Sequence, residues 1–320
     1  MPVPLEQASA SIGAQGSDGS SSSAVTPISI PSSSGSTTAA AAEATSDTTS
    51  PTQSSAAPSS PAPSTGAKSN ITPGGKKAGI SGYGNIAMMA DWTQFTPHIS
   101  WYSDYTPNPP DSGDVKGIGM LWGSGSQGPD DSSRLATFKS VITPNPPAYM
   151  MGFYEPDWTP PDSSAISPTD AATLWSSLLA PLATSPAHTL LGSPSLAKQL
   201  DETWLTPFAN TPQKPTWDFT CIHANKNSSD GVKADVEYYA TKYGKPVWVA
   251  EFSCMNDEEW TACEDPVTFI KETVQYLEGD ERVVAYGYSN GDGLPEDWKL
   301  FDKQGGITAN GKVYLEALGG

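Results

Sequence analysis

Short apolar runs alternate with longer stretches of helical periodicity from residue 78 to the C-terminus. This alternation is typical of proteins in which helices join parallel strands. Eight runs are predicted as strands: Ala78–Tyr83, Ile99–Tyr102, Gly117–Trp122, Ala148–Phe153, Thr189–Ser193, Phe219–His223, Pro246–Glu251 and Val283–Ser289. Eight strand–helix units in the 243 residues 78–320 match the usual size of a (β/α)8 TIM barrel, which is the predicted fold.

Start and stop signals support the helices between these strands. Pro168 stands at a first-turn position before the periodic stretch Ala171–Leu182. Gly244 ends the pattern over Val232–Tyr243, as expected for a helix C-terminus. Two further helices are predicted, from Asp265-Pro266 to Gly279 and over Gly311–Leu318.

The alternative α/β fold is an open, doubly wound sheet, whose nucleotide-binding form carries a GxGxxG loop after the first strand. Gly82-Tyr83-Gly84 follows the first predicted strand, but residue 87 is Ala, so the motif is incomplete. The barrel is therefore preferred. No nucleotide and no other cofactor is expected.

Residues 1–77 differ in composition from the rest of the chain. They contain 29 Ser or Thr residues, many Ala and Pro, and no aromatic residue. Such a segment buries too little apolar surface to offset the entropy of ordering it. We therefore expect a disordered Ser/Thr/Pro/Ala-rich tail over 1–77 and one catalytic-type barrel over 78–320.

Charge excludes two classes of partner. The net charge is −18, and residues 1–77 contribute only −1 of it, from four acids and three bases. A surface this acidic repels phosphate backbones and anionic lipid headgroups, so neither nucleic acid nor a membrane surface is an expected partner. No apolar run is long enough to span a bilayer.

The N-terminal residues bear on location. Met1-Pro2-Val3-Pro4 begins no secretory signal pattern, which favours an intracellular protein. However, the Ser/Thr/Pro tract 50–64 resembles an O-glycosylated stalk, and Asn70 and Asn227 begin N-glycosylation sequons. We expect a secreted or cell-wall-associated protein whose signal has been removed; a cytosolic tail is the alternative.

Three cysteines are too few for a disulfide scaffold. Cys254 and Cys263 are nine residues apart across an acidic loop, close enough to form a disulfide. Cys221 lies in an apolar run and is interpreted as a buried core residue rather than as a nucleophile paired with His223. No Cys/His spacing fits zinc, and no acidic loop fits a calcium motif, so no metal is expected.

Two glutamates occupy the ends of predicted strands. Glu155 ends the fourth strand and Glu251 ends the seventh. Function in a barrel lies at the C-terminal ends of the strands, and strands four and seven can present their side chains to one another across the mouth. A protonated and an ionised carboxyl group facing each other are the apparatus of a retaining glycosidase. A rim salt bridge or a helix cap is the alternative role for either residue.

The residues 78–320 resemble glycoside hydrolase family 128, the family of the fungal alkali-sensitive-linkage type. The resemblance rests on Ile99-Ser-Trp-Tyr102, Gly152-Phe-Tyr-Glu-Pro-Asp157, Gly192-Ser-Pro-Ser-Leu196, Phe219-Thr-Cys-Ile-His223 and Lys245-Pro-Val-Trp-Val-Ala-Glu-Phe-Ser-Cys254. It implies a retaining β-1,3-glucanase, with Glu155 as the acid/base and Glu251 as the nucleophile.

The sequence departs from this family at two places. Tyr154 stands where the family has an Asn before its acid, and that Asn is expected to bond the sugar 2-hydroxyl. Ala224-Asn225 follows His223, where the family tends to have an aromatic residue. Both changes fall in the expected binding cleft.

Aromatic rings at strand ends are candidate sugar platforms, because pyranose faces are apolar. The candidate substrate-binding residues are Trp101, Tyr102, Trp122, Tyr154, Trp158, His223, Tyr286, Tyr288 and Trp298. For His223, a hydrogen bond to sugar or to Glu251 and a buried structural role both remain open. Trp175, Trp204, Trp217 and Trp248 are expected in the core.

Three functions are compatible with these features. The first is a retaining glycoside hydrolase that cleaves β-1,3-glucan of fungal-type cell walls. The second is a protein that binds β-1,3-glucan or gluco-oligosaccharide with weak or no turnover, as the change at Tyr154 suggests. The third is a wall-anchored structural protein. We expect a monomer in each case.

Overall fold

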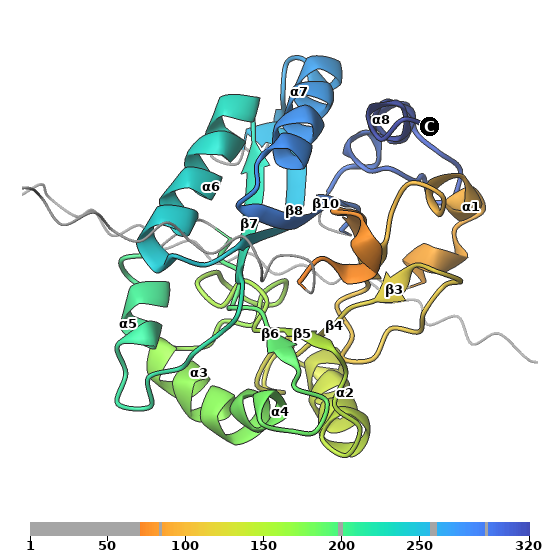
Figure 1. Ribbon diagram of the computed structural model, residues 1–320. Coiled ribbons are helices and arrows are strands. Elements are labelled where there is room, and N and C mark those ends of the chain that lie inside the picture. The colour runs from red at the N-terminus through yellow and green to blue at the C-terminus, as the bar shows by residue number, and fades with distance from the viewer. Residues whose placement is uncertain (1–70, 83–84, 198–200, 257–260, 292–293) are drawn as a thin grey trace, which may run out of the picture. The chain divides into compact units, whose positions relative to one another are not determined.

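Parallel strands form the wall of a barrel in the computed structural model, which describes residues 71–82, 85–197, 201–256, 261–291 and 294–320 (Figure 1). The strands are β1 (Ala78–Ser81), β2 (Trp101–Ser103), β3 (Lys116–Gly117), β4 (Gly119–Met120), β5 (Tyr149–Met151), β6 (Leu190–Leu191), β7 (Thr220–Lys226), β8 (Val247–Asn256) and β10 (Val283–Ser289). The short strand β9 (Thr261–Ala262) pairs antiparallel with the end of β8.

The strands form two sheets that meet at both edges. One sheet has the order β3-β2-β1-β10-β8-β7 and the other has the order β4-β5-β6. Between β3 and β4, the backbone N–H of Ile118 donates to the carbonyl of Tyr102 at 2.8 Å. At the other edge, Gly192 forms a parallel bridge with Phe219. Since β3 and β4 are two parts of one predicted strand, the wall has eight strands and the predicted (β/α)8 barrel is confirmed.

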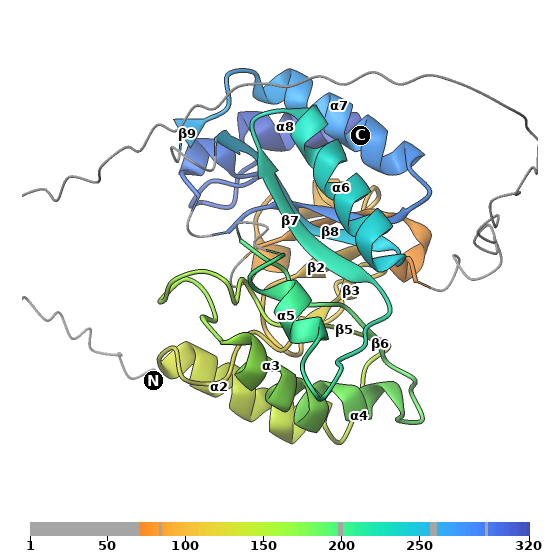
Figure 2. The ribbon, with the colours of Figure 1, turned by 90° about the vertical axis from the view of Figure 1, so that its left-hand side faces the viewer.

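Helices surround this wall on the outside (Figures 1 and 2). They are α1 (Trp92–Phe95), α2 (Pro129–Thr137), α3 (Pro168–Leu174), α4 (Ala180–Ala183), α5 (Leu205–Ala209), α6 (Ser229–Tyr243), α7 (Pro266–Gly279) and α8 (Ala309–Ala317). A π-helical turn, Trp175–Leu179, joins α3 to α4, and a second, Phe138–Ile142, follows α2. Short 3₁₀ turns lie at Pro73–Gly75, Ile86–Met88 and Glu296–Trp298.

Local capping explains where the two longest helices begin and end. The Ser228 hydroxyl accepts a hydrogen bond from the N–H of Gly231 at the start of α6, and Gly244 ends this helix with φ 62°. The Asp265 carboxylate caps α7 by accepting from the N–H of Thr268 at 3.0 Å. The predicted stop at Gly244 is therefore confirmed, whereas α6 begins at Ser229, three residues before the predicted stretch Val232–Tyr243.

The apolar core has two layers. One fills the barrel interior, where Trp101 and Trp248 pack edge to face with ring centroids 4.9 Å apart. Glycine makes room for them: a Cβ added to Gly79 would lie 2.3 Å from the Trp101 ring. The larger layer lies between the outward side chains of the strands and the helices. Strand alternation decides which layer receives each residue.

Residues 71–77 close the N-terminal end of the barrel. Ile71 packs against the interior layer, and the Thr72 hydroxyl donates to the carbonyl of Val284 at 2.9 Å. The Lys77 ammonium donates to the carbonyls of Leu277, Glu278 and Asp280 at the end of α7, at distances of 2.8–3.1 Å. The folded unit therefore includes residues before 78, while the predicted disordered tail, except for 71–77, lies outside the described residues.

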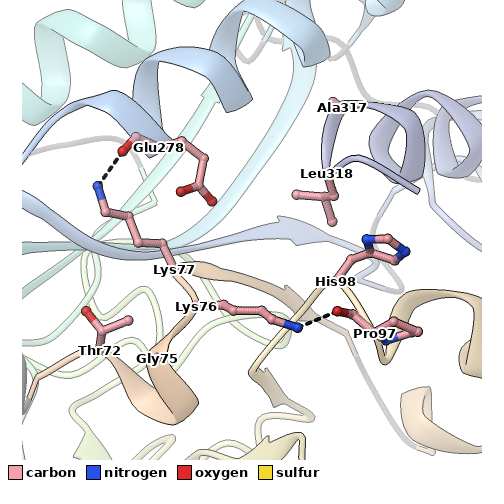
Figure 3. Close-up of a pocket in the computed structure, with 9 residues that line it drawn as sticks. All are labelled: Thr72, Gly75, Lys76, Lys77, Pro97, His98, Glu278, Ala317 and Leu318. Atoms are coloured by element: carbon pink, nitrogen blue, oxygen red, sulfur yellow. Dashed lines mark hydrogen bonds between the residues drawn. The ribbon is translucent and has the colours of Figure 1, made fainter.

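A pocket of about 590 Å³ lies at this end, between residues 72–77, Pro97–His98 and the ends of α7 and α8 (Figure 3). Lys76 and Lys77 reach across it to backbone carbonyls, of Pro97 and Glu278 in the figure. It lies at the opposite end of the strands from Glu155 and Glu251. We assign it no function.

No helix among the described residues is long and apolar enough to cross a bilayer. The same residues contain no group of three or more His, Cys, Asp or Glu side chains placed to hold a metal ion.

Candidate functional site

Glu155 reaches the barrel mouth through an unusual backbone conformation. Just beyond β5, Tyr154 forms a parallel bridge with Ser195. Glu155 is the next residue, and its N–H donates to the Ser195 carbonyl at 2.9 Å. Glu155 has φ 42°, in the left-handed region of backbone conformation that residues other than glycine rarely adopt. This conformation breaks the strand alternation, so Tyr154 packs into the interior layer while Glu155 also contacts the mouth residue His223.

Glu251 reaches the mouth by a different device, a bulge in β8. Val249 pairs with Ile222 of β7, yet Glu251 pairs with the next β7 residue, His223. The pairing with β10 shows the same extra residue in β8. Tyr286 pairs with Val249, whereas Tyr288, two residues later, pairs with Phe252, three residues later. One extra residue therefore lies near Ala250, and a bulge turns the following side chain to the other face of the sheet. As a result, Ala250 and Glu251 both point inward.

His223 lies between the two carboxylates. Its Nδ1 is 2.7 Å from Oε1 of Glu155, and its Nε2 is 3.6 Å from Oε1 of Glu251. The imidazole is fully buried, and the side chains of Glu155 and Glu251 are 15% and 4% exposed. The hydroxyl of Ser289 donates to Oε2 of Glu251 at 2.8 Å. The structure thus brings both predicted glutamates and the predicted histidine into one network.

Burial and charge shift the protonation of this network. Burial raises the pKa of Glu155, the hydrogen bond to His223 opposes this, and the Glu251 charge adds to the rise. Burial alone would lower the pKa of His223, but the negative charges of Glu251 and Glu155 raise it above its ordinary value. Both groups therefore hold a proton to higher pH than they would in water.

The Tyr154 ring fills the space beside this network. It stacks on Trp122 with centroids 5.9 Å apart and planes 14° apart, and it also lies 5.0 Å from Tyr105 and 5.2 Å from His223. Only 6% of Tyr154 is exposed. The guanidinium of Arg134 covers the Trp122 ring at 5.0 Å, which extends the stack toward helix α2.

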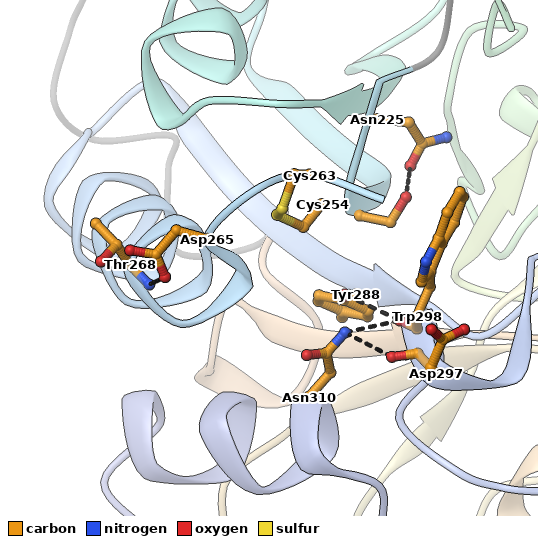
Figure 4. The surroundings of a disulfide bond; sticks show 10 residues. Asn225, Cys254, Cys263, Asp265, Thr268, Tyr288, Asp297, Trp298 and Asn310 are labelled. Carbon is orange, nitrogen blue, oxygen red and sulfur yellow. Dashed lines mark hydrogen bonds between the residues drawn. A yellow bond between two sulfur atoms is a disulfide. The ribbon is translucent and has the colours of Figure 1, made fainter. Parts of the chain in front are cut away.

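Two other candidate platforms lie outside the strands. Trp158 is 44% exposed, and its backbone N–H donates to the carbonyl of Glu155 at 3.1 Å, so it belongs to the loop that begins at the mouth. Trp298 packs with Met255 and Leu294 and is 7% exposed. Figure 4 shows its ring extending toward the end of β7, where Asn225 accepts a hydrogen bond from Ser253. Of the two, Trp158 offers the more accessible ring.

Five residues predicted as sugar platforms belong to the core instead: Trp101, Tyr102, Trp122, Tyr286 and Tyr288 are 0–2% exposed. Trp101 begins β2 rather than ending it, so its ring lies deep in the barrel. The three tyrosines point outward between strands and helices. On β10, alternation turns Gly287 and Ser289 inward and the tyrosines outward. The expectation that these five line the cleft is corrected accordingly.

The expected core tryptophans Trp175, Trp204, Trp217 and Trp248 are all buried. Cys254 and Cys263 form the expected disulfide, with Cα atoms 5.3 Å apart (Figure 4). Cys221 is a buried free thiol, and burial raises its pKa. Because a thiol nucleophile needs the opposite shift, the core interpretation of Cys221 is supported.

Sequence reasoning missed the serine that binds Glu251. Ser289 ends the predicted strand 283–289, so the strand-end rule that selected the glutamates would also have selected it. Tyr105, which packs against Tyr154, lies beyond β2 with φ 62°, and no local sequence signal indicates that conformation.

This chain is similar to known proteins over most of its length. The family described as the glycosyl hydrolase catalytic core matches residues 80–314. A solved oligosaccharide-binding protein of glycoside hydrolase family 128, subgroup VII, from Trichoderma gamsii is 37% identical, with a TM-score of 0.70. The alignment covers 78% of this chain and 96% of that one. The chain belongs to glycoside hydrolase family 128.

A second member of subgroup VII of family 128, an oligosaccharide-binding protein from Cryptococcus neoformans, is 39% identical with a TM-score of 0.68. Its alignment covers 81% of this chain and 99% of that one. Alkali-sensitive linkage protein 1 of Schizosaccharomyces pombe is 29% identical over an alignment of 222 residues, and the alignment covers 62% of this chain. The chain spans only 40% of the length of this curated relative. The resemblance to family 128 drawn from the motifs is thus confirmed.

Proposed function

We propose that this family 128 barrel binds β-1,3-linked gluco-oligosaccharides at its mouth and hydrolyses them weakly or not at all. Two relatives at 37% and 39% identity, aligned over nearly their whole length, are described as oligosaccharide-binding proteins. The β-1,3 linkage follows from the family resemblance. The observation that carries the proposal is the Tyr154 ring beside Glu155.

Tyr154 affects hydrolysis in two ways. The Asn usual at this position would bond the sugar 2-hydroxyl, and that bond strengthens as the transition state forms. The Tyr ring instead stacks on Trp122 and contacts Tyr105 and His223. It therefore withholds a transition-state hydrogen bond and occupies volume next to Glu155. Loss of such a bond slows the chemical step without removing ground-state binding.

Binding draws on the groups that remain at the mouth. The exposed Trp158 ring offers an apolar face of the kind on which a pyranose stacks. The carboxylates of Glu155 and Glu251 accept hydrogen bonds from sugar hydroxyls, and bonds to charged groups are the stronger ones. An acidic cleft also suits a neutral sugar better than a phosphorylated ligand.

Retaining hydrolysis is the second candidate function, and the Glu155–His223–Glu251 network favours it. The raised pKa of Glu155 suits a group that must donate a proton to the leaving glycosidic oxygen. In this scheme Glu251 attacks the anomeric carbon as that bond breaks, forming a glycosyl ester. Glu155 then takes a proton from water, whose oxygen displaces Glu251 and restores both residues.

We also propose that the protein acts outside the cell as a monomer. The Cys254–Cys263 disulfide supports an oxidising compartment, because cytosolic reductants keep most thiols reduced.

Titration calorimetry tests the proposed binding. The protein should bind a β-1,3-linked glucose hexasaccharide more tightly than its β-1,4-linked counterpart. Trp158→Ala should weaken binding by roughly tenfold, since one ring stack contributes about 1 kcal/mol or more, while Trp158→Phe should retain most of the affinity. Equal or absent heats with both sugars would contradict the proposal.

A further inference from the structure

A row of three buried serines crosses the wall beneath the mouth. Ser103 of β2, Ser81 of β1 and Ser289 of β10 are partners in parallel register. Each is 0–2% exposed. A buried hydroxyl costs free energy unless it forms a hydrogen bond, so three in one row call for a reason beyond packing.

Two of these hydroxyls bond to the segment that carries Glu251. Ser81 donates to the carbonyl of Ala250 at 2.6 Å, and Ala250 lies at the bulge in β8. A bulge disrupts the ladder of strand hydrogen bonds, so a side-chain donor at this carbonyl favours the bulged conformation. Ser289 donates to Oε2 of Glu251 at 2.8 Å. The other oxygen, Oε1, then faces His223 at 3.6 Å.

We infer that Ser81 and Ser289 are positioning residues for Glu251. Ser81 stabilises the bulge that turns the Glu251 side chain inward, and Ser289 fixes the rotation of its carboxylate. The Ser81 hydroxyl donates to the Ala250 carbonyl and the Ser289 hydroxyl donates to the Glu251 carboxylate, so each serine acts through Glu251. The inference deepens the proposed function, because Glu251 is one of the groups proposed to bind sugar hydroxyls.

Ser103 supplies a matched control. It is buried in the same row, but its hydroxyl accepts a hydrogen bond from the N–H of Tyr105, at 3.4 Å, rather than bonding to β8. Ser81→Ala and Ser103→Ala therefore remove the same atom from neighbouring strands. Only Ser81→Ala removes the donor at the bulge.

The primary readout is an NMR pH titration of the His223 imidazole. The charges that face this ring come from Glu251 on β8 and from Glu155 and Asp157 after β5. Ser81→Ala should lower the pKa of His223 toward its ordinary value, because Glu251 is no longer held against the ring. Ser103→Ala should leave the titration unchanged. A Ser81→Ala titration identical to wild type, or an equal shift in Ser103→Ala, would overturn the inference.

A second pair of variants guards against a folding failure of Ser81→Ala. Thr and Val have nearly the same shape, but only Thr retains the hydroxyl, so Ser81→Thr should preserve the His223 titration and Ser81→Val should shift it. The affinity for a β-1,3-linked glucose tetrasaccharide should follow the same order, falling about tenfold without the hydroxyl, which corresponds to one charge-assisted hydrogen bond. If wild type binds no sugar, the proposed function fails, while the His223 titration still decides the role of the serines.

Discussion

The Tyr154 ring lies against three other rings at the mouth, and Glu155 follows it directly in the chain. Replacing it with the Asn usual in the family should open the space beside Glu155 and restore a donor to the sugar. Tyr154→Asn should raise hydrolysis of β-1,3-glucan by about tenfold, the size of one transition-state hydrogen bond. Reducing-sugar release measures this effect.

Tyr154→Phe is the control for this substitution, because it keeps the ring and removes only the hydroxyl. It should leave hydrolysis at the wild-type level. An equal rate for Tyr154→Asn and wild type, in a variant that still binds sugar, would mean that Tyr154 does not limit turnover.

The protonation of His223 should make stability depend on pH. Its pKa is higher in the folded state, so the native protein holds the proton longer than the unfolded chain. The resulting stabilisation is fully present below the ordinary imidazole pKa of 6.5 and is lost as the pH rises through the raised value. The pKa of Glu155 is also raised, so its proton stabilises the native protein in the same way. This stabilisation is fully present below the ordinary value of 4.5 and is lost as the pH rises through the raised value.

Urea unfolding at a series of pH values measures this dependence. The free energy of unfolding of wild type should fall as the pH rises above 6.5. Glu251→Gln removes a charge that raises the His223 pKa, so its decline should be smaller. A steeper decline in Glu251→Gln than in wild type would contradict the assigned network.

Strand-end position was enough to predict Glu155, Glu251 and His223 at one mouth, because parallel strands bring their C-terminal ends together. The conformations that make these side chains meet were not predictable. Glu155 adopts a left-handed φ, and Glu251 follows a bulge detectable only from the register of both neighbouring strands. Such features depend on tertiary contacts rather than on local sequence.

At the scale of elements, β8 is the longest strand and extends beyond Glu251 into a hairpin with β9. Cys254 and Cys263 close this hairpin, and Met255 packs on Leu294 and Trp298. The aromatic platforms were predicted less well than the strands themselves. The period-two alternation of a strand shows that neighbouring side chains point to opposite faces of the sheet. An error of one residue in the predicted register places every inward side chain outside and every outward side chain inside.

Removing the disulfide should destabilise the protein by about 2–3 kcal/mol, the value expected for a loop of this length. The double variant Cys254→Ser/Cys263→Ser should show this loss in urea unfolding. Thiol counting on the unfolded, unreduced wild type should find one free thiol, that of Cys221. Three free thiols would contradict both the pairing and the argument for an oxidising compartment.

At the scale of the whole molecule, the barrel begins earlier than its first strand. The contacts of Ile71, Thr72 and Lys77 with the N-terminal end of the barrel tie this segment to the folded unit. The change in composition after Lys77 predicted that the folded domain begins at residue 78, where the aromatic-rich part of the chain starts. It could not locate these contacts, because Thr72 meets Val284, which is 212 residues away in the sequence.

Limited trypsin digestion should therefore cut after Lys68 and spare the bond after Lys77. Lys77 donates to three carbonyls at the end of α7, so cleavage beside it requires local unfolding. Mass spectrometry of the resistant fragment gives its first residue. A fragment that begins at Ala78 under native conditions would show that residues 71–77 do not belong to the stable unit.

The mouth is proposed to bind a β-1,3-glucan oligosaccharide while Tyr154 restrains its hydrolysis. One proton NMR time course on a mixture of the protein with a β-1,3-linked glucose hexasaccharide tests both parts. We predict immediate broadening of the sugar resonances, which reports binding, and little growth of new reducing-end anomeric signals. Rapid growth of those signals would contradict the restraint on hydrolysis, and unchanged sugar resonances would contradict binding itself.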